Sequence, residues 1–224
     1  MNIFLKFYFR LIKPIHDTFQ MVVWIYKYKK QKAAIQKNNH ERVNELLSTN
    51  EPIYLEFGAG TRKLDGWVSV DIEENNDIII DLSEPIIFPD NSVAKIYSSH
   101  FLEHFHYDEL IQLLRECYRV LIKGGTFSAA VPNAQIYIEA YLNPTKINPE
   151  LFCKYKPGYH HNSKIDYINY IAYMGGHHKY MFDNENIISI LEKTGFENVK
   201  TREYDFAIDN PERDYESLYV ICRK

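Results

Sequence analysis

From residue 51 onward, short apolar runs alternate with segments in which apolar residues recur at helical spacing. We expect strands over residues 53–57, 67–70, 78–80, 94–98, 126–131, 199–204 and 218–222. The helical spacing predicts helices over 107–121 and 184–194, and glycines follow each of them as stop signals. Strands that alternate with helices predict an α/β fold with a doubly wound, mostly parallel sheet.

The first 50 residues have a different pattern, in which polar residues form one stripe of a helix among many large apolar ones. Pro14 is expected to divide this segment into two helical pieces. The longest uncharged run, residues 18–26, is nine residues long, whereas a bilayer span needs roughly 20. The polar positions recur at steps of three and four: Asn2, Lys6, Arg10, Lys13, Asp17 and Gln20.

Charge is distributed unevenly between this segment and the rest of the chain. Residues 1–37 hold eight basic residues and one acid, although the whole chain has a net charge of −4. A basic amphipathic segment without a cleavage site predicts an anchor in the membrane interface through residues 1–30. The alternative is a helix that packs on the body or on a second subunit. We therefore expect a cytoplasmic protein that lies peripherally on the inner face of the membrane.

Composition limits the remaining function classes. The three cysteines are too few and too scattered for a disulfide framework or a structural zinc site, and they are typical of a reducing compartment. The overall acidity argues against a nucleic-acid partner. We expect two parts, a helical extension over 1–50 and a catalytic domain over 51–224, and the sequence leaves the oligomeric state open.

Three of the predicted strands end in an acid, namely Glu56, Asp71 and Asp81. Ligands of open α/β sheets bind at the carboxyl ends of the strands, and Gly58-Ala59-Gly60 would let a ligand approach the backbone there. A dinucleotide site would need a third glycine and an acid about 20 residues further on. Neither is present, so we expect a nucleoside ligand without a phosphate clamp, and S-adenosylmethionine meets that description.

These segments resemble the class I S-adenosylmethionine-dependent methyltransferases, and among them the small bacterial enzymes associated with surface-polysaccharide biosynthesis. The resemblance covers residues 51–224 and rests on LEFGAG, GWVSVDI, FPDNSVAKIYSSHFLEH and LIKGGTFSAAVPN. It implies a seven-stranded, Rossmann-like sheet whose last strand is antiparallel. It also implies that S-adenosylmethionine is the cofactor and that these residues bind it: Glu56, Gly58, Ala59, Gly60, Asp71, Ile72, Asp81, Leu82, Ser99 and His100.

Within that set, the resemblance assigns the methionine end to Glu56 and the glycines, the ribose to Asp71, and the adenine to Asp81 with the Leu82 backbone. The connection TRKLDG is too short for the helix that most class I enzymes have there, and it has room for one turn or a loop. The partner of the methionine carboxylate is therefore open, with Thr61 and Arg62 as candidates.

The chemistry of the reaction points to residues 99–104. A hydroxyl acceptor must lose a proton, and His100 and His104 follow the fourth strand with suitable chemistry. We predict both as catalytic residues and slightly favour His104. The alternative is that Glu103 and His104 have only a structural role, as a capping pair at the start of a helix. We expect no metal, although a divalent ion on His100, Glu103 and His104 stays open as an alternative.

The acceptor is expected to lie against residues 133–182, which form an insertion longer than the fold requires. The insertion holds eight tyrosines, which could bind a sugar or pack a small core, and we predict His177, His178 and Tyr180 as substrate-binding residues. The leading hypothesis is O-methylation of a sugar in a surface glycan or its lipid-linked precursor. The alternatives are another small acceptor, such as a quinone or phenol, and a catalytically silent cofactor-binding scaffold.

Overall fold

A computed structural model describes residues 13–160 and 162–224 of the chain. The chain divides into two compact units, of which the first ends at Asn44 and the second runs from Glu45 to Lys224. The second unit contains the sheet and all the candidate site residues.

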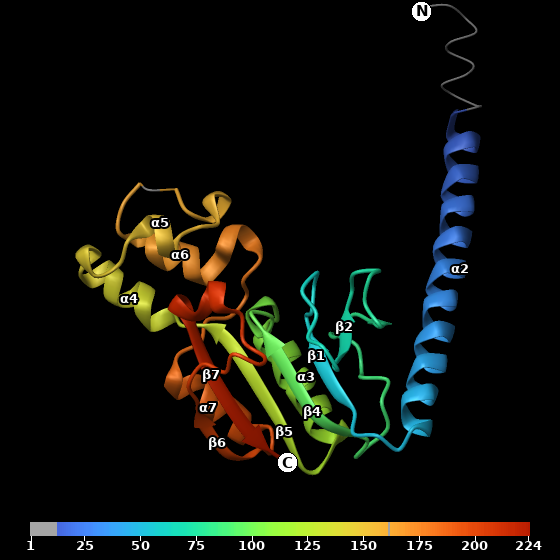
Figure 1. The fold of residues 1–224 in the computed structure, drawn as a ribbon. Helices are drawn as coiled ribbons and strands as arrows, with labels where there is room; N and C mark the ends of the chain where they lie inside the picture. The colour runs from blue at the N-terminus through green and yellow to red at the C-terminus, as the bar shows by residue number, and fades with distance from the viewer. Residues whose placement is uncertain (1–12, 161) are drawn as a thin grey trace, which may run out of the picture. The chain divides into compact units, whose positions relative to one another are not determined.

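The described part of the second unit contains one sheet of seven strands in the order β3-β2-β1-β4-β5-β7-β6 (Figure 1). Every neighbouring pair is parallel except those made by β7, which is antiparallel to β5 and β6. The expected seven-stranded, mostly parallel sheet with an antiparallel last strand is confirmed. The strands are β1 (Tyr54–Phe57), β2 (Val68–Asp71), β3 (Ile78–Ile79), β4 (Val93–Ser99), β5 (Leu121–Pro132), β6 (Glu197–Thr201) and β7 (Ser217–Arg223).

The central strands are apolar runs because both of their faces are covered. In β1, Leu55 pairs with Ile96 of β4, and both side chains are almost fully buried. Phe127 of β5 and Val220 of β7 continue this core across the sheet. The acids at the ends of β1 and β2 therefore lie at a common edge of the sheet, where these two parallel strands end.

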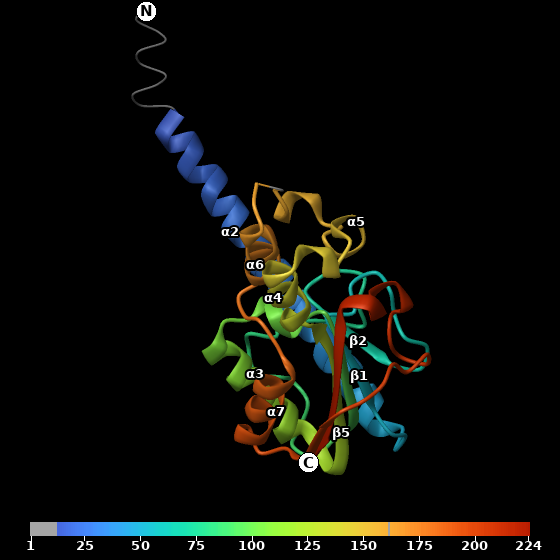
Figure 2. The same cartoon turned by 90° about the vertical axis from the view of Figure 1, so that its left-hand side faces the viewer.

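Helices α3 (Tyr107–Val120) and α7 (Asn184–Lys193) lie on one side of the sheet (Figure 2). The N-terminus of α3 is fixed by the Glu109 carboxylate, which accepts a hydrogen bond from the His106 backbone N–H at 3.0 Å. Strand β5 begins at Leu121, five residues earlier than predicted. The early start has a physical cause: Leu121 pairs with Val93 across a register shift, so the glycines that we expected only to stop α3 lie inside the strand.

The insertion folds into a small helical subdomain beyond the carboxyl end of β5 (Figure 1). Its α-helices are α4 (Ala134–Leu142), α5 (Pro149–Phe152) and α6 (Ile165–Tyr173), and the short 3₁₀ turn η5 (Met174–Gly176) follows them. Four of its eight tyrosines are core residues rather than ligands for a substrate: Tyr137, Tyr159, Tyr167 and Tyr170. The tyrosine-rich composition therefore reflects the packing of this subdomain as well as its surface.

The first unit contains most of helix α2 (Lys13–Ser48), which has Pro14 in its first turn. The predicted helical piece before Pro14 lies outside the described residues, as does half of the predicted polar stripe, namely Asn2, Lys6 and Arg10. Along α2, the side chains of Met21, Trp24, Tyr26 and Tyr28 are exposed. Within residues 13–160 and 162–224, no helix is both long and apolar enough to cross a bilayer.

Candidate active site

The connection between β1 and β2 is a loop without a helix, as its length predicted, and Gly58 begins it in the left-handed region with φ +66°. Its N–H donates to the Val70 carbonyl at 3.0 Å. A Cβ on Gly58 would lie 2.4 Å from the Phe101 ring, so only glycine is accommodated. This contact also places the segment that follows β4 directly against the loop that follows β1.

Gly60 and Asp71 connect the ends of β1 and β2. The Gly60 N–H donates to Asp71 Oδ2 at 3.0 Å, and Asp71 Oδ1 accepts from the Glu73 N–H at 3.2 Å. Gly60 has φ +56°, and a Cβ there would meet no atom within 4 Å. The backbone at Gly60 therefore borders open space beside a carboxylate, which suits a ligand with hydroxyl groups.

Glu56 is buried at the end of β1, where its Oε2 accepts a hydrogen bond from the Leu64 N–H at 2.8 Å. Burial raises the pKa of this carboxyl, while the Leu64 N–H and the nearby Arg62 oppose that shift. The Arg62 guanidinium itself donates to the Asp209 carbonyl at 3.2 Å, and the Thr61 side chain is exposed. Glu56 thus has a structural contact that holds the loop, in addition to its predicted contact with the methionine end.

The remaining predicted cofactor residues lie at the same edge of the sheet. Ile72 is 67% exposed directly after Asp71, although it is a large apolar residue, and the flat face of an adenine would cover it. Asp81 Oδ1 accepts from the N–H and the hydroxyl of Ser83 at 2.9 and 2.7 Å, and Leu82 is buried. The open cradle at Gly60 and the uncovered Ile72 are suited to an adenosyl group.

We expect Asp71→Ala to weaken S-adenosylmethionine binding by about 1–3 kcal/mol, because buried ribose hydroxyls would lose their acceptor. Isothermal titration calorimetry measures this change directly. Asp65→Ala, which removes an exposed carboxylate from the same connection, is the matched control and should bind like the wild type. Wild-type affinity in Asp71→Ala would show that the ribose binds elsewhere.

A second group of predicted residues begins at His100, which follows β4 in the left-handed region with φ +49°. Its backbone N–H donates to the Ala130 carbonyl at 2.8 Å, which fixes the turn. The ring is buried, and its Nε2 lies 2.8 Å from Ser217 Oγ. Burial lowers the pKa of His100 well below its usual value, with a smaller contribution from Arg213. His100 is therefore neutral near pH 7. Its ring is too buried to exchange protons freely with solvent.

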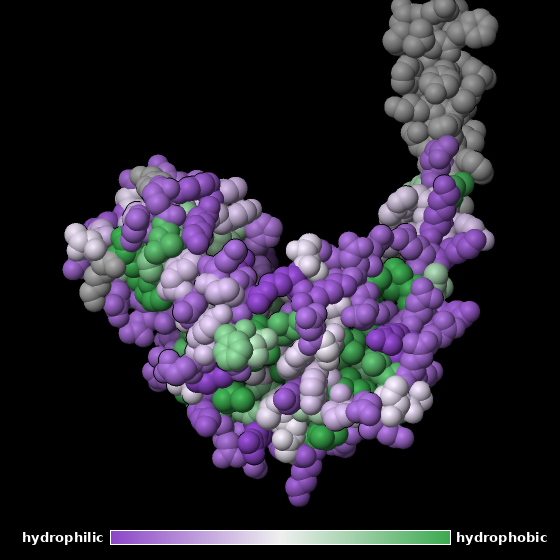
Figure 3. Space-filling model, viewed as in Figure 1, coloured by the Kyte–Doolittle hydropathy of each residue, from purple (hydrophilic) through white to green (hydrophobic). Residues whose placement is uncertain are grey.

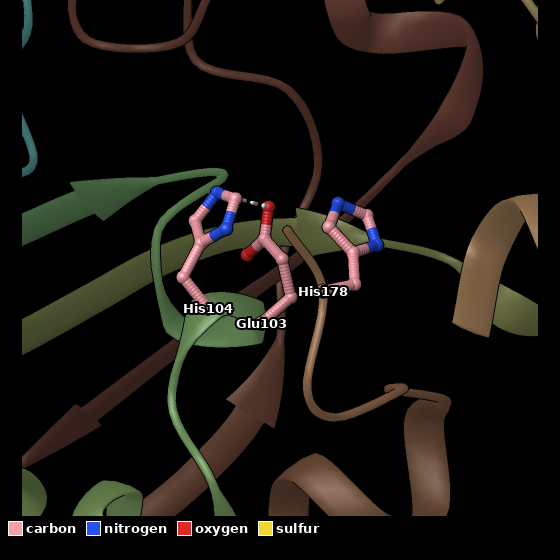
Figure 4. Close-up of side chains that lie close together, drawn as sticks. All are labelled: Glu103, His104 and His178. Atoms are coloured by element: carbon pink, nitrogen blue, oxygen red, sulfur yellow. Dashed lines mark ion pairs between the residues drawn. The ribbon is translucent and has the colours of Figure 1, made fainter. Parts of the chain in front are cut away.

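The insertion contributes the segment 177–180 to the same place. The Glu103 carbonyl accepts hydrogen bonds from the Lys179 N–H at 2.7 Å and from the Tyr180 N–H at 3.2 Å. Just before this segment, Gly175 and Gly176 have φ values of +65° and +100°, so the chain turns sharply onto Glu103. These contacts bring the predicted His178 beside Glu103 and His104 (Figure 4).

Glu103 is the most buried charged-type side chain of this group, with 1% of its surface exposed. Burial raises its pKa to about 8. His178 is also buried, and burial lowers its pKa to about 4. His104 differs because 41% of its side chain is exposed, and its Nε2 lies 3.9 Å from Glu103 Oε1.

These residues line a cavity of about 460 Å³. Of the predicted acceptor residues, His177 and His178 line it, but Tyr180 does not. The Tyr180 ring lies tilted beside that of Tyr107 and edge-on to that of Phe182, with centroid distances of 5.7 and 5.3 Å. It borders a different cavity. The sequence interpretation missed the wall formed by Lys154 and by the turn η6 (Pro211–Glu216), since no local pattern marks it. The lining comprises His100, Glu103, His104, Lys154, Tyr155, Tyr170, Met174, His177, His178, Glu212, Arg213, Tyr215 and Glu216.

Comparison with known families gives one match, between residues 67–129 and the model of a methyltransferase domain. The matched segment runs from β2 into β5 and includes Asp71, Asp81 and the whole of residues 99–104. No curated protein matches the chain.

Several solved structures are similar to the chain at low sequence identity. One is an S-adenosylmethionine-dependent methyltransferase from Archaeoglobus fulgidus, with 18% identity over 90% of this chain and 99% of that one and a TM-score of 0.48. Another, from Mesorhizobium loti, has 17% identity over 81% and 96% of the two chains and a TM-score of 0.47. A phosphoethanolamine N-methyltransferase from Haemonchus contortus has 13% identity over 83% and 52% of the chains and a TM-score of 0.48.

Proposed function

We propose that this chain is a class I S-adenosylmethionine-dependent methyltransferase, in agreement with its match to a methyltransferase domain and with its sheet order, and that it methylates a hydroxyl of a sugar in a surface glycan or its lipid-linked precursor. The observation that carries the proposal is the position and lining of the 460 Å³ cavity. His100 lines the cavity. The next residue, Phe101, packs on Gly58 in the predicted cofactor loop. An acceptor in this cavity would therefore lie beside the methyl donor.

The lining of the cavity supports a sugar. The rings of Tyr155 and Tyr215 border it, and such rings offer flat apolar faces for a pyranose and hydroxyl tips for its polar groups. Lys154 and Arg213 add positive charge that could pair with the phosphate of an activated or lipid-linked sugar. A quinone or phenol would need fewer charged partners than this cavity provides.

His104 supports the assignment to a hydroxyl acceptor. S-adenosylmethionine supplies a methyl group on a positively charged sulfur, from which the acceptor oxygen takes it. The acceptor hydroxyl loses its proton as its oxygen forms the new bond to carbon. The His104 Nδ1–H donates to the His177 carbonyl at 2.9 Å, so Nε2 keeps a lone pair that can accept this proton.

Two assays distinguish this proposal from its alternatives. A catalytically silent scaffold that lost the site would show no heat of binding with S-adenosylmethionine in calorimetry. For an active enzyme, transfer of a labelled methyl group to lipid-linked and nucleotide-activated sugars is compared with transfer to phenols and quinols. Labelled sugar supports the proposal, whereas label found only in the aromatic acceptors would replace it with the quinone or phenol alternative.

Exposed apolar side chains support an acceptor at a membrane surface. The helical subdomain has hydrophobic surface, drawn in green in Figure 3. Its exposed apolar side chains include Ile138, Leu142, Leu151 and Ile165. On α2, Trp24 is 64% exposed and stacks on Tyr28 with ring centroids 5.6 Å apart. A peripheral anchor in residues 1–30 would concentrate the enzyme where a lipid-linked sugar is found.

We expect Trp24→Glu to weaken sedimentation with anionic vesicles without changing S-adenosylmethionine affinity. The substitution removes an interfacial ring and adds a negative charge, and one charge near an anionic surface contributes about 1 kcal/mol. Gln36→Glu makes the same charge change on the same helix beyond residue 30 and should bind vesicles like the wild type. A truncation that starts at Asn38 should no longer sediment. If the full chain ignores vesicles and the truncation changes its oligomeric state, the segment is a packing helix.

A further inference from the structure

Three side chains of types that commonly bind metal ions lie close together at the wall of the cavity. One ligand atom each from Glu103, His104 and His178 lies within 4.8 Å of the others (Figure 4). His100 lies next to this group, with its Nδ1 3.8 Å from Glu103 Oε1. Two ligands of one zinc ion lie about 3–3.5 Å apart at the usual metal–ligand distances, so a small inward movement would bring these atoms into coordination.

Hydrogen bonds fix which nitrogen of His104 and of His178 carries the proton. In His104, Nδ1 lies 2.9 Å from the His177 carbonyl oxygen, and in His178, Nδ1 lies 2.8 Å from the Ile171 carbonyl oxygen. A carbonyl oxygen can only accept, so both Nδ1 atoms carry hydrogen. Both Nε2 atoms therefore have a free lone pair. Metal-bound histidines typically donate their other N–H to a backbone carbonyl in this way.

In His100 the two ring nitrogens have exchanged roles, but a nitrogen lone pair again faces Glu103. The Ser217 hydroxyl donates its hydrogen to the Arg213 carbonyl at 2.6 Å, so its oxygen accepts from His100 Nε2 at 2.8 Å. Nε2 therefore carries the proton, and the lone pair is on Nδ1, the atom that lies 3.8 Å from Glu103. Three imidazole lone pairs are thus presented to one carboxylate.

The Glu103 carboxylate completes the argument, because it is buried and incompletely paired. Its Oε2 has no hydrogen-bond partner among the residues that the structure describes. The imidazole nitrogens of His100 and His104 lie 3.8 and 3.9 Å from the other oxygen, Oε1. A buried carboxylate that has an oxygen without a donor, beside nitrogen lone pairs, is suited to bind a cation. Imidazole and carboxylate ligands without cysteine suit a first-row divalent ion such as Zn²⁺.

We propose that Glu103, His104 and His178 bind a divalent transition-metal ion as its three protein ligands. The ion would lie at the wall of the cavity, where an open coordination position could take the acceptor oxygen and make its hydroxyl more acidic. His104 would then act through the metal rather than as the proton acceptor. The binding of the ion rests on these three side chains, whereas its use for the acceptor rests on the proposed function.

The test uses the full-length protein after treatment with EDTA and dialysis, and titrates it with Zn²⁺ in a calorimeter. We expect one ion per chain. Loss of groups that only orient metal ligands lowers affinity by roughly 10–100-fold, so Glu103→Gln and His178→Gln, which remove ligands, should lower it by about 100-fold or more. His177→Gln is the matched control, because it removes the neighbouring imidazole, whose Nε2 lies 3.3 Å from the Tyr155 hydroxyl. It should bind zinc like the wild type.

A second readout covers the case in which a variant is poorly folded. Zinc should raise the melting temperature of the wild type and of His177→Gln but not that of Glu103→Gln, since only a bound ion stabilises the folded state. Unchanged affinity in Glu103→Gln, or an equal loss in His177→Gln, would overturn the proposal and leave a protonated, neutral Glu103 in place of a bound ion. The calorimeter measures metal binding and not methyl transfer. The metal proposal can therefore hold if no sugar is methylated, and it can be wrong if the protein is an active sugar methyltransferase.

Discussion

Replacing His104 by alanine is expected to lower kcat on the true acceptor about 100-fold or more, while S-adenosylmethionine affinity changes little. The imidazole is the most exposed of those around Glu103, and its Nε2 lone pair is open to the cavity. As the proton acceptor or as a metal ligand, it acts on the acceptor hydroxyl and not on the cofactor. Steady-state kinetics with the acceptor, combined with calorimetry for the cofactor, separates the two effects.

The matched control is His40→Ala, which removes an exposed imidazole from α2, far from the cavity in sequence, and should leave kcat unchanged. His100→Ala tests the second catalytic candidate by the same assay. If both His104→Ala and His100→Ala keep the full kcat, positioning alone drives the reaction. If only chelation abolishes turnover and a divalent ion restores it, the metal has the catalytic role instead of the free imidazole.

Replacing Asp209 by alanine is expected to lower the free energy of unfolding by about 3–5 kcal/mol, because it would leave Arg202 without its partner in a mostly buried place. Asp209 is fully buried, and its carboxylate accepts two hydrogen bonds from the Arg202 guanidinium, at 2.5 and 2.8 Å. It also accepts from the Tyr97 hydroxyl at 2.8 Å and from the Asp205 N–H at 2.7 Å. This network ties the loop before β7 to β4.

Chemical denaturation followed by circular dichroism measures this change. Asp214→Ala is the control, since Asp214 is an exposed carboxylate that accepts one hydrogen bond from the Tyr219 hydroxyl at 3.0 Å. Exposed pairs contribute about 1 kcal/mol or less. Equal stability of the two variants would mean that the Asp209 network does not hold the loop.

Local pattern was sufficient to predict the sheet and the edge at which Glu56, Asp71 and the glycines after β1 lie together. The apolar runs of β1 and β4 are typical of strands buried on both faces of a sheet. The glycines after β1 adopt positive φ values, which glycine tolerates more easily than other residues. Asp71 was found because it ends a strand, and parallel strands end at one edge. These features depend on neighbours in sequence, so the sequence could show them.

The cluster around Glu103 could be predicted only in part. The spacing of His100, Glu103 and His104 marks them as candidates together, but His178 joins them through backbone hydrogen bonds to Glu103 across more than 70 residues. Nothing local indicates that pairing. The same holds for Arg213, which the turn before β7 brings to the cavity.

Mass spectrometry of surface glycans from cells with and without the gene tests the central claim most directly. If the domain methylates a sugar hydroxyl, one glycan component should lose the mass of a methylene group when the gene is absent. Restoring the gene should return that mass, whereas restoring it with His104→Ala should not. Identical glycan masses in the presence and absence of the gene, in cells that contain the protein, would contradict the account.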